Sequence, residues 1–167
     1  RPTASFGIAI GNTARAANAA TALGYAVTAA GANSVAIGNS ATTTASGAVV
    51  IGQNASVYIT ETQSVAIGQN ASTTRTATGG GESVAVGGNA FAGEWRATAL
   101  GWKAKATAIS STAIGRGALS EYTHAIAVGR GAWTNAANQI AIGFSGGDVA
   151  TDVYFESGHT SKYVDWP

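Results

Sequence analysis

The eight residues SVAIGNSA, from Ser34 to Ala41, decide the fold of this chain. The same pattern returns with small changes as SVAIGQNA from Ser64 to Ala71 and as SVAVGGNA from Ser83 to Ala90. Near-copies of this kind indicate an internal repeat, and an internal repeat determines the fold more strongly than any local propensity.

The repeat can be followed through the glycine that ends each apolar-x-apolar triplet. Successive glycines of this kind are mostly 14 residues apart, with spacings of 13, 14, 14, 16, 19, 14, 14, 14 and 14. The ten glycines are Gly11, Gly24, Gly38, Gly52, Gly68, Gly87, Gly101, Gly115, Gly129 and Gly143. A unit of this length that recurs ten times is typical of a solenoid, in which each turn of chain stacks on the previous one.

Each repeat alternates between large and small residues just before its glycine. The residue before the glycine is always a branched aliphatic, the third residue before it is always β-branched, and nine of the ten residues between them are alanine. Alternation with a period of two is typical of a β-strand. A second strand is expected about three residues past the glycine, around Ala41, Ala55, Ala71, Ala90, Ala104, Ala118 and Ala132.

These patterns predict an all-β protein: a parallel β-roll of about ten 14-residue rungs over residues 1–146. Residues 147–167 are expected to form a separate, non-repeat C-terminal β segment that leads to the next domain. The chain starts in mid-pattern and stops at Trp166-Pro167, so we expect it to be a segment of a longer protein.

The alternation also predicts two faces for each strand. We expect the large residues to fill the interior of the roll: Val35, Ile37, Val65, Ile67, Val84, Val86, Ile114, Ile126, Val128, Ile140 and Ile142. The alanines between them would then face outward, and a solvated column would not stay apolar over ten repeats. We therefore expect identical chains to associate laterally around a rotation axis, through a seam of Ala36, Ala66, Ala85, Ala99, Ala113, Ala127 and Ala141.

The composition limits the classes of function. Charged residues make up 10% of the chain and the net charge is +1, so no strongly basic face is expected to bind nucleic acid. The chain has no cysteine, which excludes a disulfide framework and a thiol nucleophile. No apolar run reaches the length that a membrane crossing needs.

The motifs SVAIGNSATTTASGA and SVAIGQNAS resemble the head repeats of trimeric autotransporter adhesins, the YadA-like head family, over about residues 6–146. The resemblance implies a left-handed, homotrimeric β-roll on a bacterial surface that adheres to a host extracellular-matrix protein or a cell-surface receptor. The family's usual neck and coiled coil are absent from this sequence. Residues 146–167 resemble segments of phage tail-fibre proteins, so a virion fibre that recognises a bacterial envelope glycan is an alternative.

Two insertions interrupt the period, one within Val57 to Gln63 and the other within Thr73 to Glu82. A solenoid tolerates insertions at outward turns, and such loops often bind ligands. Tyr58, Glu61 and Arg75 are therefore candidate ligand contacts, although loops of this kind can also be mere decoration.

A second group of candidates follows the corner glycines. Arg116 and Arg130 occupy the same place in successive repeats, with Trp102 and Lys103 one repeat earlier. Stacked cations beside an aromatic residue could bind sulfated glycans or lipopolysaccharide. The alternatives are a solvated ladder of charges and, for the aromatic residues, packing between chains.

No constellation for catalysis or for a cofactor appears in the sequence. His124 and His159 each lack a second histidine or a cysteine at ligand spacing, although three copies of His159 on a symmetry axis could hold a cation. We expect no catalytic residue, no metal and no cofactor. The predicted function is attachment by a multivalent fibre segment, with a passive spacer rod and an ice-binding solenoid as alternatives.

Overall fold

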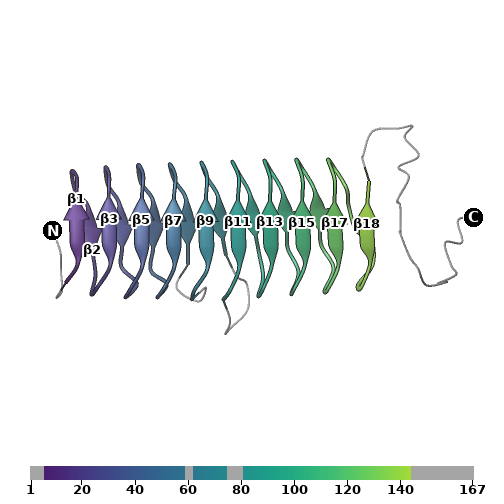
Figure 1. Ribbon diagram of the computed structural model, residues 1–167, viewed down its shortest axis with the longest axis horizontal. Helices are drawn as coiled ribbons and strands as arrows, with labels where there is room; N and C mark the ends of the chain where they lie inside the picture. Colours follow the sequence, from purple (N-terminus) through teal and green to yellow (C-terminus); the bar gives the residue numbers. More distant parts are fainter. Residues whose placement is uncertain (1–5, 59–61, 75–80, 144–167) are drawn as a thin grey trace, which may run out of the picture.

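The computed structural model describes residues 6–58, 62–74 and 81–143, and these residues coil into a straight rod of stacked rungs (Figure 1). Every rung contributes one strand to a ten-stranded sheet along one side of the rod. Its strands, in spatial order, are β1 (Ile8–Ile10), β3 (Thr21–Leu23), β5 (Val35–Ile37), β7 (Val49–Ile51), β9 (Val65–Ile67), β11 (Val84–Val86), β13 (Thr98–Leu100), β15 (Thr112–Ile114), β17 (Ile126–Val128) and β18 (Ile140–Ile142).

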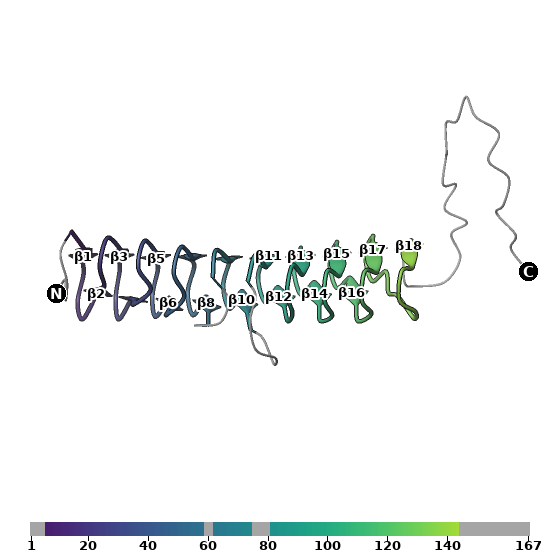
Figure 2. The same cartoon turned by 90° about the horizontal axis from the view of Figure 1, so that it is seen from below.

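A second sheet of eight two-residue strands lies behind the first, so the rod has two layers (Figure 2). These strands are β2 (Arg15–Ala16), β4 (Thr28–Ala29), β6 (Thr42–Thr43), β8 (Ser56–Val57), β10 (Ser72–Thr73), β12 (Phe91–Ala92), β14 (Lys105–Ala106) and β16 (Leu119–Ser120). They begin four residues past the corner glycine, one residue later than the alanines that the sequence indicated.

In the ten-stranded sheet similar residues lie over one another, and all the pairings between the named strands of both sheets are parallel. Val35 pairs with Val49, Val49 with Val65 and Val65 with Val84. The last two pairings bridge the insertions, which therefore fall at a corner and leave the register intact. The predicted parallel roll of 14-residue rungs is confirmed.

Each rung turns two corners, and both use backbone conformations with positive φ. At the first corner, Gly101 has a φ of 132° and a Cβ there would lie 2.6 Å from the carbonyl oxygen of Gly115 on the next rung. Two residues past the corner glycine a left-handed residue follows, and Asn54, Asn70 and Asn89 hold this place with φ near 55°. Asparagine adopts this conformation more easily than most residues.

The three asparagines also form a ladder along the rod, which gives a first testable prediction. Asn54 Nδ2 donates to Asn70 Oδ1 and Asn70 Nδ2 donates to Asn89 Oδ1, both at 3.3 Å. Asn70→Ala should lower the free energy of unfolding by about 1–2 kcal/mol, because it adds left-handed strain and removes two exposed hydrogen bonds.

Asn70→Gly is the matched control, since it removes the same hydrogen bonds but tolerates a positive φ. Urea unfolding should rank the stabilities as asparagine, then glycine, then alanine. If the glycine variant were the least stable of the three, the left-handed conformation would not explain the cost.

The interior of the roll is lined with very small side chains, which corrects the assignment of its two faces. The alanines proposed for an outward seam point inward: Ala36, Ala66, Ala85, Ala99, Ala113 and Ala127 have no exposed surface, and Ala141 is partly buried in the last rung. The second sheet adds Ala29, Ala92 and Ala106 from the other side. Valine, threonine and serine are the largest side chains that the described interior buries fully.

The large residues predicted for the core instead face outward on the ten-stranded sheet. Val35, Ile37, Val65, Ile67, Val84, Val86, Ile126 and Val128 are half-buried, whereas Ile114, Ile140 and Ile142 are exposed by 38%, 65% and 49%. A 14-residue rung is too short to enclose two facing layers of valine and isoleucine. The two sheets approach closely, and only alanine-sized side chains fill the gap at normal packing density.

Candidate binding surfaces

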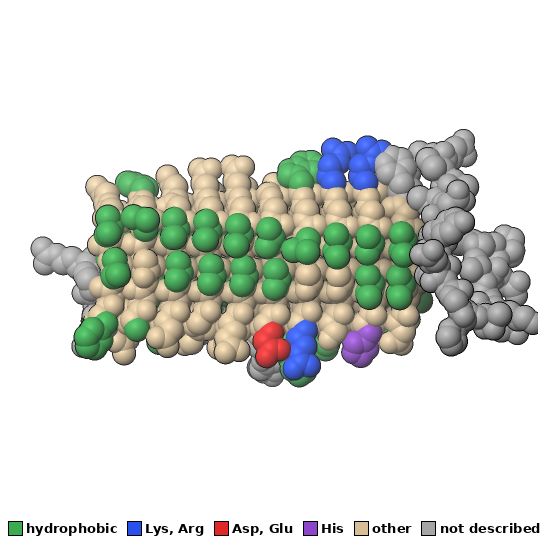
Figure 3. Space-filling model, viewed as in Figure 1, with side chains coloured by type: hydrophobic (Ala, Val, Ile, Leu, Met, Phe, Trp, Pro, Cys, Tyr) green, Lys and Arg blue, Asp and Glu red, His purple; other side chains and the backbone are tan. Residues whose placement is uncertain are grey.

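The outer face of the ten-stranded sheet is a continuous apolar surface, shown as two rows of green side chains in Figure 3. The row just before the corner glycines is aliphatic in every rung: Ile10, Leu23, Ile37, Ile51, Ile67, Val86, Leu100, Ile114, Val128 and Ile142. The parallel row two residues earlier is β-branched and is interrupted by Thr21, Thr98 and Thr112. We call these two rows together the apolar face.

The apolar face is unusual for a surface that meets only water. Soluble monomers rarely expose a contiguous apolar patch of this extent, and large patches mark contacts with another molecule. Here the side chains are regularly spaced and form a flat surface, because every rung places them at the same height above the sheet. This surface suits contact with an equally regular partner.

The corner beside the apolar face carries a cluster of cations around one indole, which we call the Trp102 edge. Trp102 is 47% exposed, Lys103 Nζ lies 4.3 Å from the centroid of its ring and Arg116 Cζ lies 5.5 Å from it. Arg130 is exposed and occupies the equivalent place on the following rung. The structure therefore brings together the candidates Trp102, Lys103 and Arg116. The fourth candidate, Arg130, lies on the rung after that of Arg116.

The indole of Trp102 lies against the preceding rung at a position where no side chain competes with it. That position is Gly88, and a Cβ built there would lie 3.2 Å from Trp102 Cδ1. The same place in the two earlier rungs holds Gln53 and Gln69, whose side chains are hydrogen-bonded to each other at 3.0 Å. The role of Gly88 was not evident from the sequence, because it stands directly after the corner glycine Gly87 and the direction of the Trp102 side chain was unknown.

The carboxylates of the described residues lie on one side of the rod, whereas cations lie on both sides. Figure 3 shows Lys and Arg side chains along one edge, and an acidic side chain beside a basic one on the opposite edge. The three carboxylates of the described residues, Glu82, Glu94 and Glu121, belong to the second corner of their rungs. At that corner Arg96 Nε donates to Glu82 Oε2 at 2.9 Å and Arg96 Cζ lies 4.3 Å from the centroid of the Trp95 ring. This pair was not expected from the sequence, although its separation of 14 residues is one repeat.

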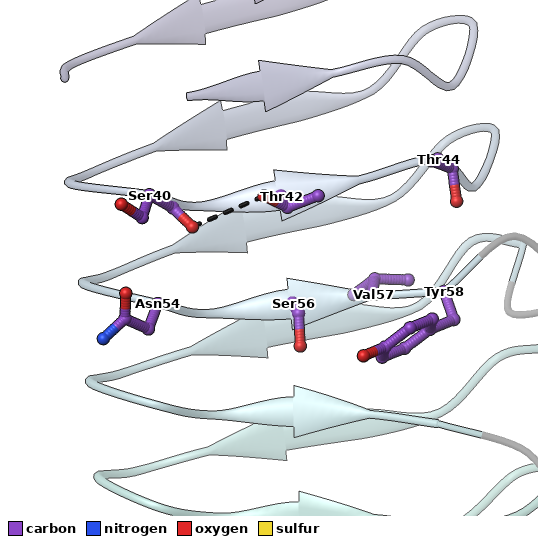
Figure 4. A pocket seen from close by; sticks show the side chains of 7 residues that line it. All are labelled: Ser40, Thr42, Thr44, Asn54, Ser56, Val57 and Tyr58. Carbon is purple, nitrogen blue, oxygen red and sulfur yellow. Dashed lines mark hydrogen bonds between the residues drawn. The ribbon is translucent and has the colours of Figure 1, made fainter. Parts of the chain in front are cut away.

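A third feature is a hollow of about 380 Å³ on the outside of the eight-stranded sheet, shown in Figure 4. Tyr58, 55% exposed, stands at one end of it, so one of the three insertion candidates borders a concavity. The other two, Glu61 and Arg75, lie outside the described residues. The hollow is uncharged and is lined by Ser40, Thr42, Thr44, Asn54, Ser56, Val57 and Tyr58.

The described residues contain neither a metal-binding cluster nor a membrane-spanning helix. Within the described ranges, no three His, Asp or Glu side chains gather closely enough to hold a metal ion. His124 is exposed at the second corner, and His159 lies outside the described residues. None of the described segments is a helix with the length and apolarity that a bilayer crossing requires.

Comparison with known proteins identifies the repeat. The family described as "YadA head domain repeat (2 copies)" matches residues 17–41, 29–55, 60–90, 96–118 and 123–145, which is well over half of the chain. The crystal structure of the collagen-binding domain of the Yersinia adhesin YadA matches with a TM-score of 0.66 and 31% sequence identity, covering 96% of this chain and 79% of that one. No functionally curated protein matches significantly.

Both matches agree with the arrangement of the rungs. The resemblance of the SVAIG motifs to YadA-like head repeats is thus confirmed. The tail-fibre resemblance expected for residues 146–167 stays a prediction, since those residues lie outside the described part of the chain. The family is one of structural adhesin domains and not of enzymes. The chain therefore belongs to the YadA head-domain repeat family and is a segment of an adhesin head.

Proposed function

We propose that this chain acts as a homotrimeric adhesin head on the outside of a bacterial cell, attaching it to a host matrix protein or receptor by multivalent binding. The observation that carries the proposal is the apolar face, which runs the length of the described rod. Three copies that packed these faces around a common axis would remove both aliphatic rows from water. Full burial of an exposed large aliphatic side chain contributes roughly 1.5–3 kcal/mol, and the side chains that are already half-buried in the single chain would contribute part of that.

The seam of this assembly differs from the one expected from sequence. The alanines are enclosed within each chain and are not accessible to a partner, so the isoleucine, leucine and valine rows form the contact. A closed ring of three identical copies fits such a strip, because every copy then turns the same apolar surface towards the common axis.

Attachment would rest on avidity and not on one tight site. A trimer presents three copies of every outward feature, and a second contact formed on the same rod is far more favourable than the first. The structural relative from Yersinia is a collagen-binding domain, so collagen is the first matrix protein to test.

The experiment measures mass and binding on the same sample. Light scattering after size exclusion should give a mass of three times 16.4 kDa, and the sample should bind immobilised fibrillar collagen with slow dissociation. As a control, Ser72→Asp places a charge on the outside of the other sheet, away from the apolar face, and should keep the mass of a trimer. A monomer at micromolar concentration would overturn the trimer. A trimer that binds neither collagen nor cultured host cells would overturn attachment and indicate a spacer.

A further inference from the structure

We propose that the Trp102 edge is a binding site for an acidic glycan, with the indole contacting a sugar ring and the cations contacting its sulfate or carboxylate groups. The inference deepens the adhesive function proposed above, because it names the class of ligand and the side chains that would hold it. It rests on the arrangement of Gly88, Trp102, Lys103, Arg116 and Arg130 on four successive rungs.

The first argument is preorganisation. Trp102 is seated over Gly88, and its ring in turn holds Lys103 Nζ at 4.3 Å and Arg116 Cζ at 5.5 Å. Cation–π contacts of this length restrict two long side chains that would otherwise sample many rotamers. A ligand that meets cations already in place loses less entropy on binding than one that must order them.

The second argument is charge. Lys103 and Arg116 lie around the indole, and Arg130 follows one rung later, about 4.8 Å further along the rod. Lys105, also exposed, is two residues beyond Lys103 and is the first residue of β14 in the second sheet. All three described carboxylates are at the opposite corner, so this edge has a local positive potential although the whole chain is nearly neutral.

The indole at the centre of the cluster favours a glycan among the possible anions. Arginine recognises sulfate and carboxylate with two parallel hydrogen bonds, whereas an exposed indole adds a flat apolar surface. A sugar ring offers apolar C–H groups next to its anionic substituents and so fits both parts. A string of cations alone would serve any polyanion, but here the aromatic ring is the centre of the cluster.

The test uses titrations of the whole chain with short heparin oligosaccharides, hyaluronan oligosaccharides and dextran. Heparin carries sulfate and carboxylate groups, hyaluronan carries carboxylates only, and dextran is neutral. We expect binding of heparin, hyaluronan or both, weakened by salt, and no binding of dextran. Trp102→Ala and the double change Arg116→Gln with Arg130→Gln should each reduce the affinity about tenfold.

Matched controls exist on the same rod. Tyr25 occupies the place of Trp102 in an earlier rung, is 58% exposed and is flanked by Asn12 and Asn39 instead of arginine. Tyr25→Ala and the remote cation change Arg15→Gln should leave the affinity within about twofold. Gly88→Gln restores the glutamine found in the two previous rungs, and it should displace the indole and weaken binding about threefold without lowering the melting temperature.

Three results would overturn the site. These are an unchanged affinity in Trp102→Ala, equal binding of polyglutamate by the unaltered chain, and a change in assembly mass caused by Trp102→Ala or Gly88→Gln, which would make the edge a chain–chain contact. The outcomes separate the two proposals. A trimer that binds collagen but no acidic oligosaccharide refutes only the glycan site, and a monomer that binds heparin through Trp102 refutes only the trimer.

Discussion

Replacing Gly101 by alanine should lower the free energy of unfolding by about 3–5 kcal/mol, a large effect for the addition of one methyl group. Two costs combine at this corner. The φ of 132° lies in a region that residues with a Cβ rarely adopt. The added Cβ would also lie 2.6 Å from the carbonyl oxygen of Gly115, which belongs to the backbone of the next rung and cannot rotate away.

The measurement is urea unfolding at a fixed protein concentration, since the stability of an assembly depends on concentration. The matched control is Gly117→Ala, two residues past the next corner. Gly117 has a φ of 69° and a Cβ there meets no atom within 4 Å, so only left-handed strain of about 1–2 kcal/mol is expected. If Gly101→Ala and Gly117→Ala lost the same free energy of unfolding, the close contact between rungs would not be the reason for glycine at the corner.

Ile67→Asp should abolish the trimer, with assembly weakened more than a thousandfold. Ile67 is a half-buried residue on the apolar face, at the middle of the rod in β9. The change removes an aliphatic side chain from each copy and brings three carboxylates towards one axis, and each carboxylate loses several kcal/mol of hydration without a partner. The single chain should remain folded, because its interior does not contain this side chain.

Analytical ultracentrifugation over a range of concentrations measures this effect, and circular dichroism verifies that the strands persist. Ile67→Val keeps the surface aliphatic and should remain trimeric. Ser72→Asp adds the same charge to β10 of the same rung, on the opposite sheet, and should also remain trimeric. If Ile67→Asp kept the mass of a trimer, the apolar face would not be the contact surface.

The sequence was sufficient to predict the rungs but not the direction in which their side chains point. Spacing alone identified the corner glycines, and the pairing of Val49 with Val65 across an insertion follows from it. Alternation, however, says only that two faces differ. The large residues were assigned to the inside because the cores of most globular proteins are built from large aliphatic side chains. In a rung this short, that assignment was wrong.

A signal for the correct assignment was present in the other columns. The positions that follow the corner by three residues are almost all alanine, and those four residues before it are mostly alanine or serine. These positions, which could share the interior with Ala66, therefore hold mostly small residues, and this indicates a narrow interior. Side-chain packing at the Trp102 edge had no such signal, because the direction of the indole depends on the space above Gly88.

The orientation of the hydrogen bonds has a mechanical consequence. Strands lie across the rod, so bonds such as Gly52 N–H to Ile37 O and Gly68 N–H to Ile51 O point along its length. Tension between the two ends of the rod would break the hydrogen bonds of one rung before those of the next. Each opened rung of 14 residues would release roughly 45 Å of chain. Such a tether would lengthen stepwise under flow, limiting the force that reaches an attached receptor.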